Sequence, residues 1–170
     1  MRKFYFAGNW KMHKTPNEAR EFAVDFAAQM GDCQHKLMIA PSFVAIPALS
    51  DALKQTGVLV GAQNCAAEVH GAFTGEVSAP MLASSGTDVV IVGHSERRTL
   101  FGEDDKLINT KVLRVLEHGM EVILCVGESL EEREAGKAMT VVLGQIEAGL
   151  QGIAAVDMRR ITIAYEPVWA

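Results

Sequence analysis

Six short apolar runs recur along this chain of 170 residues, and each of the first five is followed by a segment whose apolar side chains have helical spacing. The runs cover residues 4–7, 37–40, 58–60, 89–92, 122–126 and 161–164. Strands that alternate with helices in this way form a parallel sheet with right-handed crossovers. The pattern leaves two α/β architectures open, a doubly wound open sheet and part of a (β/α)₈ barrel.

Helix signals fill the segments between these runs. Thr15 to Glu18 form a capping box with proline at the first helical position, and Gly31 closes the helix. We predict further helices from residue 43 to Gly57, over 79–84, up to His118, and over a region that begins at 131. The apolar side of the helix that ends at Gly57 is expected to comprise Ile46, Leu49, Ala52 and Leu53. The apolar side of the region that begins at 131 is expected to comprise Val142, Leu143, Ile146 and Leu150.

The fourth run is followed at once by titratable residues. Residues 89–92 are all β-branched, which is typical of a strand buried on both faces, and Gly93 ends the run. We predict that Ser95 caps a helix that starts there and that His94 lies beside its positive end, which favours the neutral imidazole. The alternative interpretation is a structural histidine followed by a solvated helix start.

Polar side chains follow three of the predicted strands. Asn9 and Lys11 follow the first strand, His94 and Glu96 follow the fourth, and Glu166 follows the sixth. An open sheet concentrates its site at one switch point, whereas a barrel gathers distant strand ends over a single mouth. The distribution therefore favours the barrel.

Composition narrows the function classes. The length fits one domain over residues 1–170, and the net charge of −5 offers no attraction to nucleic acid or an anionic membrane. Cys33, Cys65 and Cys125 share no metal-ligand spacing, and we expect reduced thiols in the cytoplasm. Dinucleotide, phosphate-loop and zinc-protease motifs are absent from the sequence, so we expect neither a metal nor another cofactor.

Five segments, taken together, resemble a known family. They are Gly-Asn-Trp-Lys at 8–11, Gly-Ala-Gln-Asn at 61–64, Gly-Ala-Phe-Thr-Gly-Glu at 71–76, Gly-His-Ser-Glu-Arg-Arg at 93–98 and Ala-Tyr-Glu-Pro-Val-Trp-Ala at 164–170. In this order they resemble the signatures of the triosephosphate isomerases. That family of aldose-ketose isomerases interconverts dihydroxyacetone phosphate and glyceraldehyde 3-phosphate in glycolysis and gluconeogenesis, without a cofactor.

The resemblance implies roles for the polar residues. Glu166 would be the base that removes a proton beside the carbonyl, and His94 would be the electrophile, a role in which this family is an established example of a neutral imidazole. Lys11 would bind the phosphorylated substrate and stabilise the oxyanion, with Asn9 as a nearby donor. Glu96 would pair with Lys11.

Supporting residues follow from the same resemblance and from position. Cys125, inside a strand, is expected to pack near the site rather than to act as a nucleophile. Arg97 and Arg98 are expected to form structural ion pairs, with Glu103 as one possible partner.

A long loop over residues 63–78 is expected to be functional, because loops of this length in compact domains usually are. It resembles the loop that this family inserts into a second subunit. Thr74 and Gly75 would then be dimer contacts, which implies a homodimer.

The resemblance also implies further chain. A complete (β/α)₈ barrel has about 250 residues, and this sequence reaches only the sixth strand and the first hinge of a lid at 167–169. We therefore expect a piece of a longer enzyme, poorly active or inactive by itself. The alternatives are a noncatalytic fragment that self-associates through open strand edges and another barrel enzyme that acts on a phosphorylated sugar.

Overall fold

The computed structural model describes residues 3–169, which include six parallel strands in one sheet. Ala170, the last residue of the fifth signature, lies outside the described residues. The strands are β1 (Tyr5–Asn9), β2 (Lys36–Ala40), β3 (Leu59–Ala62), β4 (Val89–Val92), β5 (Glu121–Val126) and β6 (Ile161–Tyr165). Each predicted run is thus a strand, with shifts of one or two residues at most ends.

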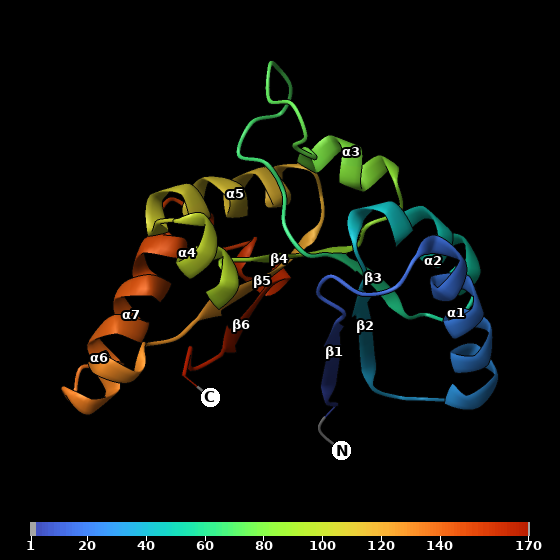
Figure 1. Ribbon diagram of the computed structural model, residues 1–170, viewed down its shortest axis with the longest axis horizontal. Helices are drawn as coiled ribbons and strands as arrows, with labels where there is room; N and C mark the ends of the chain where they lie inside the picture. Colours follow the sequence, from blue (N-terminus) through green and yellow to red (C-terminus); the bar gives the residue numbers. More distant parts are fainter. Residues whose placement is uncertain (1–2, 170) are drawn as a thin grey trace.

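The order of the strands decides between the two architectures. Every strand pairs with its neighbours in the sequence, so the sheet reads β1-β2-β3-β4-β5-β6 without a reversal. A doubly wound sheet reverses its order at a switch point. Figure 1 shows that the sheet curls and that helices cover its outer side. The fold is therefore an incomplete (β/α)₈ barrel with six strands, as the sequence predicts.

Seven α-helices connect these strands within the described residues. They are α1 (Pro16–Met30), α2 (Ile46–Leu53), α3 (Ala79–Ser84), α4 (Ser95–Phe101), α5 (Asp105–Glu117), α6 (Leu130–Glu134) and α7 (Ala138–Gly149). Short 3₁₀ helices occupy Phe43–Ala45 and Met158–Arg160. The capping box of α1 is confirmed, because the Thr15 N–H donates to Glu18 Oε2 at 2.7 Å and Glu18 N–H returns a bond to Thr15 Oγ1.

Two helix predictions were partly wrong. The region from 131 to 150 forms two helices, because the chain turns at Gly136 with φ of 70°. Leu143 is exposed instead of lying on the apolar side. Helix α2 was predicted to continue to Gly57, but it ends at Leu53. Ala52, which was predicted on its apolar side, is exposed.

The core has two parts because the strands are covered on both faces. Val90 and Val92 point outward and pack beneath the helices, whereas Val89 and Ile91 point into the curl of the sheet. Successive strand residues point to opposite faces, so an all-apolar run is needed where both faces are buried. This explains why the fourth run contains no polar residue.

The loop that joins β3 to α3 projects away from the sheet (Figure 1), and it contains Thr74 and Gly75. Residues 71–76 are exposed. None of the helices described here has the length and apolar character that crossing a membrane would require.

Candidate active site

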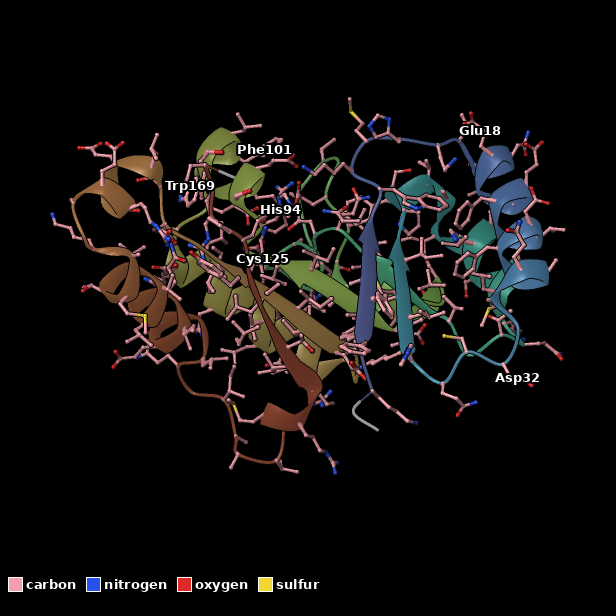
Figure 2. The ribbon with its side chains drawn as sticks, turned by 90° about the horizontal axis from the view of Figure 1, so that it is seen from below. Glu18, Asp32, His94, Phe101, Cys125 and Trp169 are labelled. Carbon is pink, nitrogen blue, oxygen red and sulfur yellow. The ribbon has the colours of Figure 1, made fainter. Side chains whose placement is uncertain are left out.

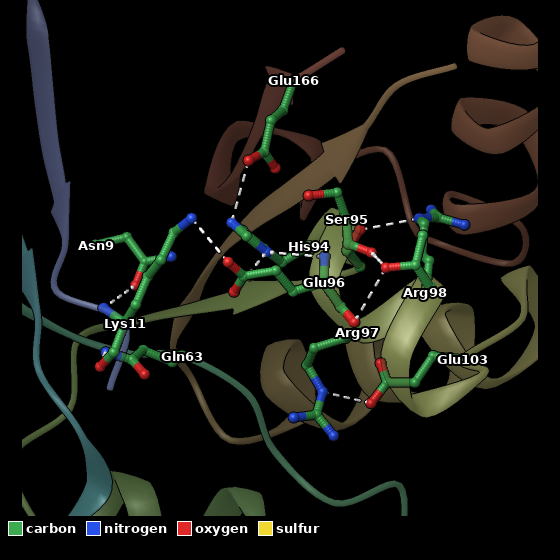
Figure 3. Close-up of polar contacts among 12 residues, drawn as sticks. Asn9, Lys11, Gln63, His94, Ser95, Glu96, Arg97, Arg98, Glu103 and Glu166 are labelled. Atoms are coloured by element: carbon green, nitrogen blue, oxygen red, sulfur yellow. Dashed lines mark hydrogen bonds and ion pairs between the residues drawn. The ribbon is translucent and has the colours of Figure 1, made fainter. Parts of the chain in front are cut away.

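The predicted site residues meet at the carboxyl ends of the strands. Figure 2 shows His94 at one end of the curled sheet, while Asp32 lies near the other end. Figure 3 shows Lys11 and Glu166 approaching the His94 region from β1 and β6. The curl of the sheet is what brings residues from the first, fourth and sixth strands to one place.

His94 lies at the start of α4, where the chain leaves β4. It is nearly buried, with 8% of its surface exposed. Its Nδ1 accepts a hydrogen bond from the Glu96 N–H at 3.3 Å. His94 itself is therefore the N-cap of α4, and the prediction of Ser95 in that position was wrong. An Nδ1 that accepts carries no proton, so the ring proton is on Nε2, 3.2 Å from Glu166 Oε1.

Lys11 is held in an unusual backbone conformation. Its φ of 53° lies in the left-handed region, which is uncommon for a residue with a side chain. Asn9 Oδ1 accepts from the Lys11 N–H at 3.0 Å, and Gln63 Nε2 donates to the Lys11 carbonyl at 2.8 Å. The same amide donates to the Ala40 carbonyl at 2.9 Å. These bonds fix the loop after β1 to the ends of β2 and β3.

The Lys11 side chain pairs with Glu96, as the resemblance implied. Lys11 Nζ lies 2.8 Å from Glu96 Oε1. The hydrogen bond between them raises the pKa of Lys11 and lowers the pKa of the Glu96 carboxyl. Both groups are therefore charged over a wide pH range, and the lysine ammonium stands beside the histidine.

Glu166 follows β6 and points toward His94 (Figure 3). Its backbone N–H donates to the Val126 carbonyl at 2.8 Å, which continues the pairing of β5 and β6. Its second carboxylate oxygen, Oε2, is buried and has no hydrogen-bond partner among the described residues. An unpaired carboxylate oxygen in a partly desolvated place is suited to accept a proton.

The two arginines after His94 form the expected ion pairs. Arg97 Nε lies 2.5 Å from Glu103 Oε1, and Arg98 pairs with Asp105 at 2.6 Å. Arg98 also donates to the carbonyls of Gly93 and Cys125, at 2.9 and 3.3 Å. It thereby ties the end of β4 to the end of β5, beneath the histidine.

Cys125 is buried at the end of β5. Burial, with a smaller contribution from the charge of Glu166, raises the pKa of its thiol to about 12. The thiolate form is therefore scarce at neutral pH, and Cys125 is a packing neighbour of Glu166 rather than a nucleophile.

A cleft of about 220 Å³ opens beside these residues, bordered by Asn9, Lys11, Gln63, His94 and Glu96. Glu166 borders an adjacent narrow crevice with Ser95 and Cys125. Thr74 and Gly75 line neither, so the chain by itself does not bring these loop residues to the site.

Comparison with known proteins agrees with this geometry. The family model of triosephosphate isomerase matches residues 4–170. Triosephosphate isomerases of Treponema denticola and Treponema pallidum (strain Nichols) are each 52% identical to the chain over 170 residues. The chain belongs to the triosephosphate isomerase family. The triosephosphate isomerase of Thermoanaerobacter pseudethanolicus is 45% identical to the chain over 170 residues. In all three cases the match covers the whole of this chain and 68% of the relative.

Two residues that hold segments of the candidate site were missed by sequence reasoning. Gln63 lies within a recognised segment, but nothing in the sequence indicates that its amide holds Lys11. Glu128, which is fully buried, accepts hydrogen bonds from Tyr165, Trp169 and Arg133 at 3.1 to 3.2 Å. Burial raises the pKa of Glu128, but these bonds and one from the backbone outweigh it and lower the pKa. The residues of the predicted lid hinge are thus tied to the end of β5.

A buried ionic cluster lies behind the cleft. Lys111 Nζ on α5 donates to Glu103 Oε1 at 2.6 Å and to Asn64 Oδ1 at 2.8 Å, and Arg97 shares the same Glu103 oxygen. The cluster links the loop after β3 to α4 and α5. Among residues 3–169 no group of three or more histidine, cysteine, aspartate or glutamate side chains is arranged to hold a metal ion.

Proposed function

We propose that this chain carries the chemistry of a triose-phosphate isomerase, the interconversion of dihydroxyacetone phosphate and glyceraldehyde 3-phosphate through an enediolate. The observation that carries the proposal is the contact of His94 Nε2 with Glu166 Oε1 at 3.2 Å, with Lys11 nearby. A base, a neutral hydrogen-bond donor and a fixed cation are what this isomerisation requires.

Glu166 is the base in this proposal. Moving a carbonyl by one carbon requires removal of a proton from the carbon beside it and its return to the neighbouring carbon. The buried and unpaired Oε2 gives the carboxylate a free acceptor for that proton. The carboxylate takes the proton from one carbon and delivers it to the other, while the hydroxyl proton moves from one substrate oxygen to the other, so the carboxylate is unchanged at the end of the cycle.

His94 stabilises the negative charge that develops on the substrate oxygen. Because its Nδ1 is occupied by the Glu96 N–H, its Nε2–H is the group available to the substrate. His94 Nε2 lies 3.2 Å from Glu166 Oε1. A substrate oxygen that replaces the carboxylate at Nε2 would leave Glu166 free to approach the carbon.

Lys11 and Asn9 bind the anionic substrate in this proposal. The protein has a net charge of −5, so attraction to a phosphate must come from local groups. Lys11 Nζ has three donors, and its single contact within residues 3–169, with Glu96, leaves others for a ligand. Glu96 orients the lysine, and Cys125 fills space behind Glu166.

The test is a coupled assay of triose phosphate interconversion by the native chain and by a Glu166→Gln variant purified identically. We expect a rate in the native chain that falls by at least about 100-fold in the variant, the scale on which general-base catalysis contributes. Equal rates in both proteins would contradict the role of Glu166 and would indicate a contaminating enzyme.

A homodimer in the cytoplasm is the further part of this proposal. Met12 and Phe101 border the cleft and expose apolar side chains, a pattern typical of interaction surfaces. The exposed loop at Thr74 and Gly75 is a suitable segment to enter the cleft of a second copy. Three free cysteines suit a reducing compartment.

Light scattering tests the homodimer. The native protein should have the mass of two chains, and Thr74→Arg should yield monomers. A native protein with the mass of one chain would contradict the dimer.

A further inference from the structure

We propose that Gln145, on a helix outside the barrel, is a positioning residue for Glu166 and acts through the backbone of Gly127. The inference rests on the proposed function, in which Glu166 is the base. It also makes a claim about backbone order that can be measured without any substrate.

The backbone of Glu166 lies directly against Gly127. A Cβ built on Gly127 would lie 1.9 Å from the Glu166 carbonyl oxygen and 2.7 Å from its carbonyl carbon. No side chain larger than hydrogen fits there unless one of the two backbones moves. Gly127 has no positive φ, so the position requires glycine for space rather than for conformation. The location of the Gly127 peptide therefore determines how closely Glu166 can approach β5.

Gln145 holds Gly127 at both of its backbone hydrogen-bonding groups, the N–H and the C=O. Its Oε1 accepts from the Gly127 N–H at 2.8 Å, and its Nε2 donates to the Gly127 carbonyl at 3.2 Å. Gln145 is the only side chain that the described residues offer to either group. A carboxamide of this length supplies a donor and an acceptor together, whereas a carboxylate lacks the donor and an ammonium lacks the acceptor.

The helix that carries Gln145 is itself firmly seated. Gly149 of α7 lies against Leu124 of β5, where an added Cβ would be 2.8 Å from the leucine side chain. Asn109 of α5 donates to the carbonyls of Gly149 and Gln151, at 3.0 and 2.9 Å. The chain of contacts runs from α7 through the Gln145 amide to Gly127, and from Gly127 by direct contact to Glu166.

The experiment compares Gln145→Met with Asn109→Leu in the full chain. Each variant removes two hydrogen bonds between a side chain and the backbone, those of Asn109 at the C-terminal end of α7 and the turn after it, and those of Gln145 at Gly127. We expect Gln145→Met to lower kcat about 10- to 100-fold with KM changed less than about threefold, because misplacement of a catalytic group by about 1 Å has effects of this size. Asn109→Leu should change kcat less than about threefold.

A second background separates positioning from loss of stability. The Glu166→Gln variant has no base to position, so adding Gln145→Met to that variant should leave its residual rate of isomerisation unchanged. Amide hydrogen exchange at Glu166 should accelerate at least about 10-fold in Gln145→Met and remain unchanged in Asn109→Leu.

The outcomes are distinguishable. Equal kcat losses in Gln145→Met and Asn109→Leu, or unchanged exchange at Glu166, would overturn the positioning role. A native chain without isomerase activity would remove the proposed function, and the exchange measurement would still decide whether Gln145 orders the Glu166 backbone.

Discussion

Two lysine–glutamate pairs, one at the cleft and one buried behind it, have similar separations but very different exposure. Lys11 and Glu96 lie 2.8 Å apart, with side chains that are 51% and 45% exposed. Lys111 and Glu103 lie 2.6 Å apart, and each side chain is only 4% exposed. The first pair stands at the mouth of the cleft, and the second lies behind it.

The difference is in how many donors and acceptors are already used. Lys111 divides its ammonium between Glu103 and Asn64, while Arg97 donates to the same glutamate oxygen. The members of this cluster bond to one another and hold the surrounding loops together; among the described residues Glu103 Oε2 is the only buried side-chain polar atom of the cluster left without a hydrogen-bond partner. In the described part of the chain, the Lys11 ammonium has one partner, Glu96, and its backbone is held by Gln63 and Asn9, so its position is fixed while its charge stays available. A substrate-binding site needs a cation that is fixed in position and still available to a ligand, whereas an ion pair in the core needs only partners within the protein.

The largest effect is expected from breaking the buried pair. Lys111→Met removes one of the cations that face Glu103, and a buried pair that loses one partner typically costs about 3–5 kcal/mol. Urea denaturation should show a fall in the free energy of unfolding of that size. A loss below about 1 kcal/mol would show that Arg97 alone compensates the buried carboxylate.

Breaking the exposed pair should affect activity and leave stability nearly intact. Lys11→Met should lower kcat/KM about 100- to 1,000-fold, because it removes a charge directed at the developing oxyanion. The free energy of unfolding should change by less than about 1 kcal/mol, as for other exposed ion pairs.

Lys14 offers a matched control for that variant. It is in the same loop, also has a positive φ, of 68°, and lies over the rings of Trp10 and Phe22 rather than in the cleft. Lys14→Met should keep kcat/KM within about threefold of the native value, as expected for a surface substitution away from the site. Similar losses in both variants would mean that loop geometry, and not the Lys11 charge, determines activity.

The smallest effect concerns the titration of Glu96. Its folded pKa is lowered, first by the hydrogen bond from Lys11, so the pair contributes stability above the ordinary glutamate pKa and loses it as the pH falls through the lowered pKa. In Lys11→Met the pKa of Glu96 should rise toward its ordinary value. Carbon-13 NMR of the carboxyl group measures this shift directly. An unchanged pKa would mean that the pair is not formed in solution.

Much of the fold could be read from local pattern. An all-apolar run such as 89–92 predicts a doubly covered strand, and polar residues after three strands predict a shared mouth once the sheet curls. The signatures placed Lys11, His94 and Glu166 because their chemistry is tied to short segments. The capping box of α1 was predictable for the same reason, since all of its partners lie within four residues.

One miss is a local choice between two neighbouring residues, and the others arise where long-range contacts decide. Ser95 is the better N-cap by residue type, but His94 takes that position because its own Nδ1 reaches the Glu96 N–H. The role of Gln145 depends on a peptide 18 residues away along the chain, and the requirement for glycine at 127 depends on the approach of β6. Neither contact leaves a periodic or compositional trace.

Proton exchange at the substrate carbon tests the central claim most directly. Dihydroxyacetone phosphate incubated with the chain in D₂O should acquire deuterium at its hydroxymethyl carbon, as followed by proton NMR. We predict that this exchange is at least about 100-fold faster with the native chain than with Glu166→Gln, because the carboxylate removes that proton. Equal rates with both proteins would contradict the assignment of Glu166 as the base.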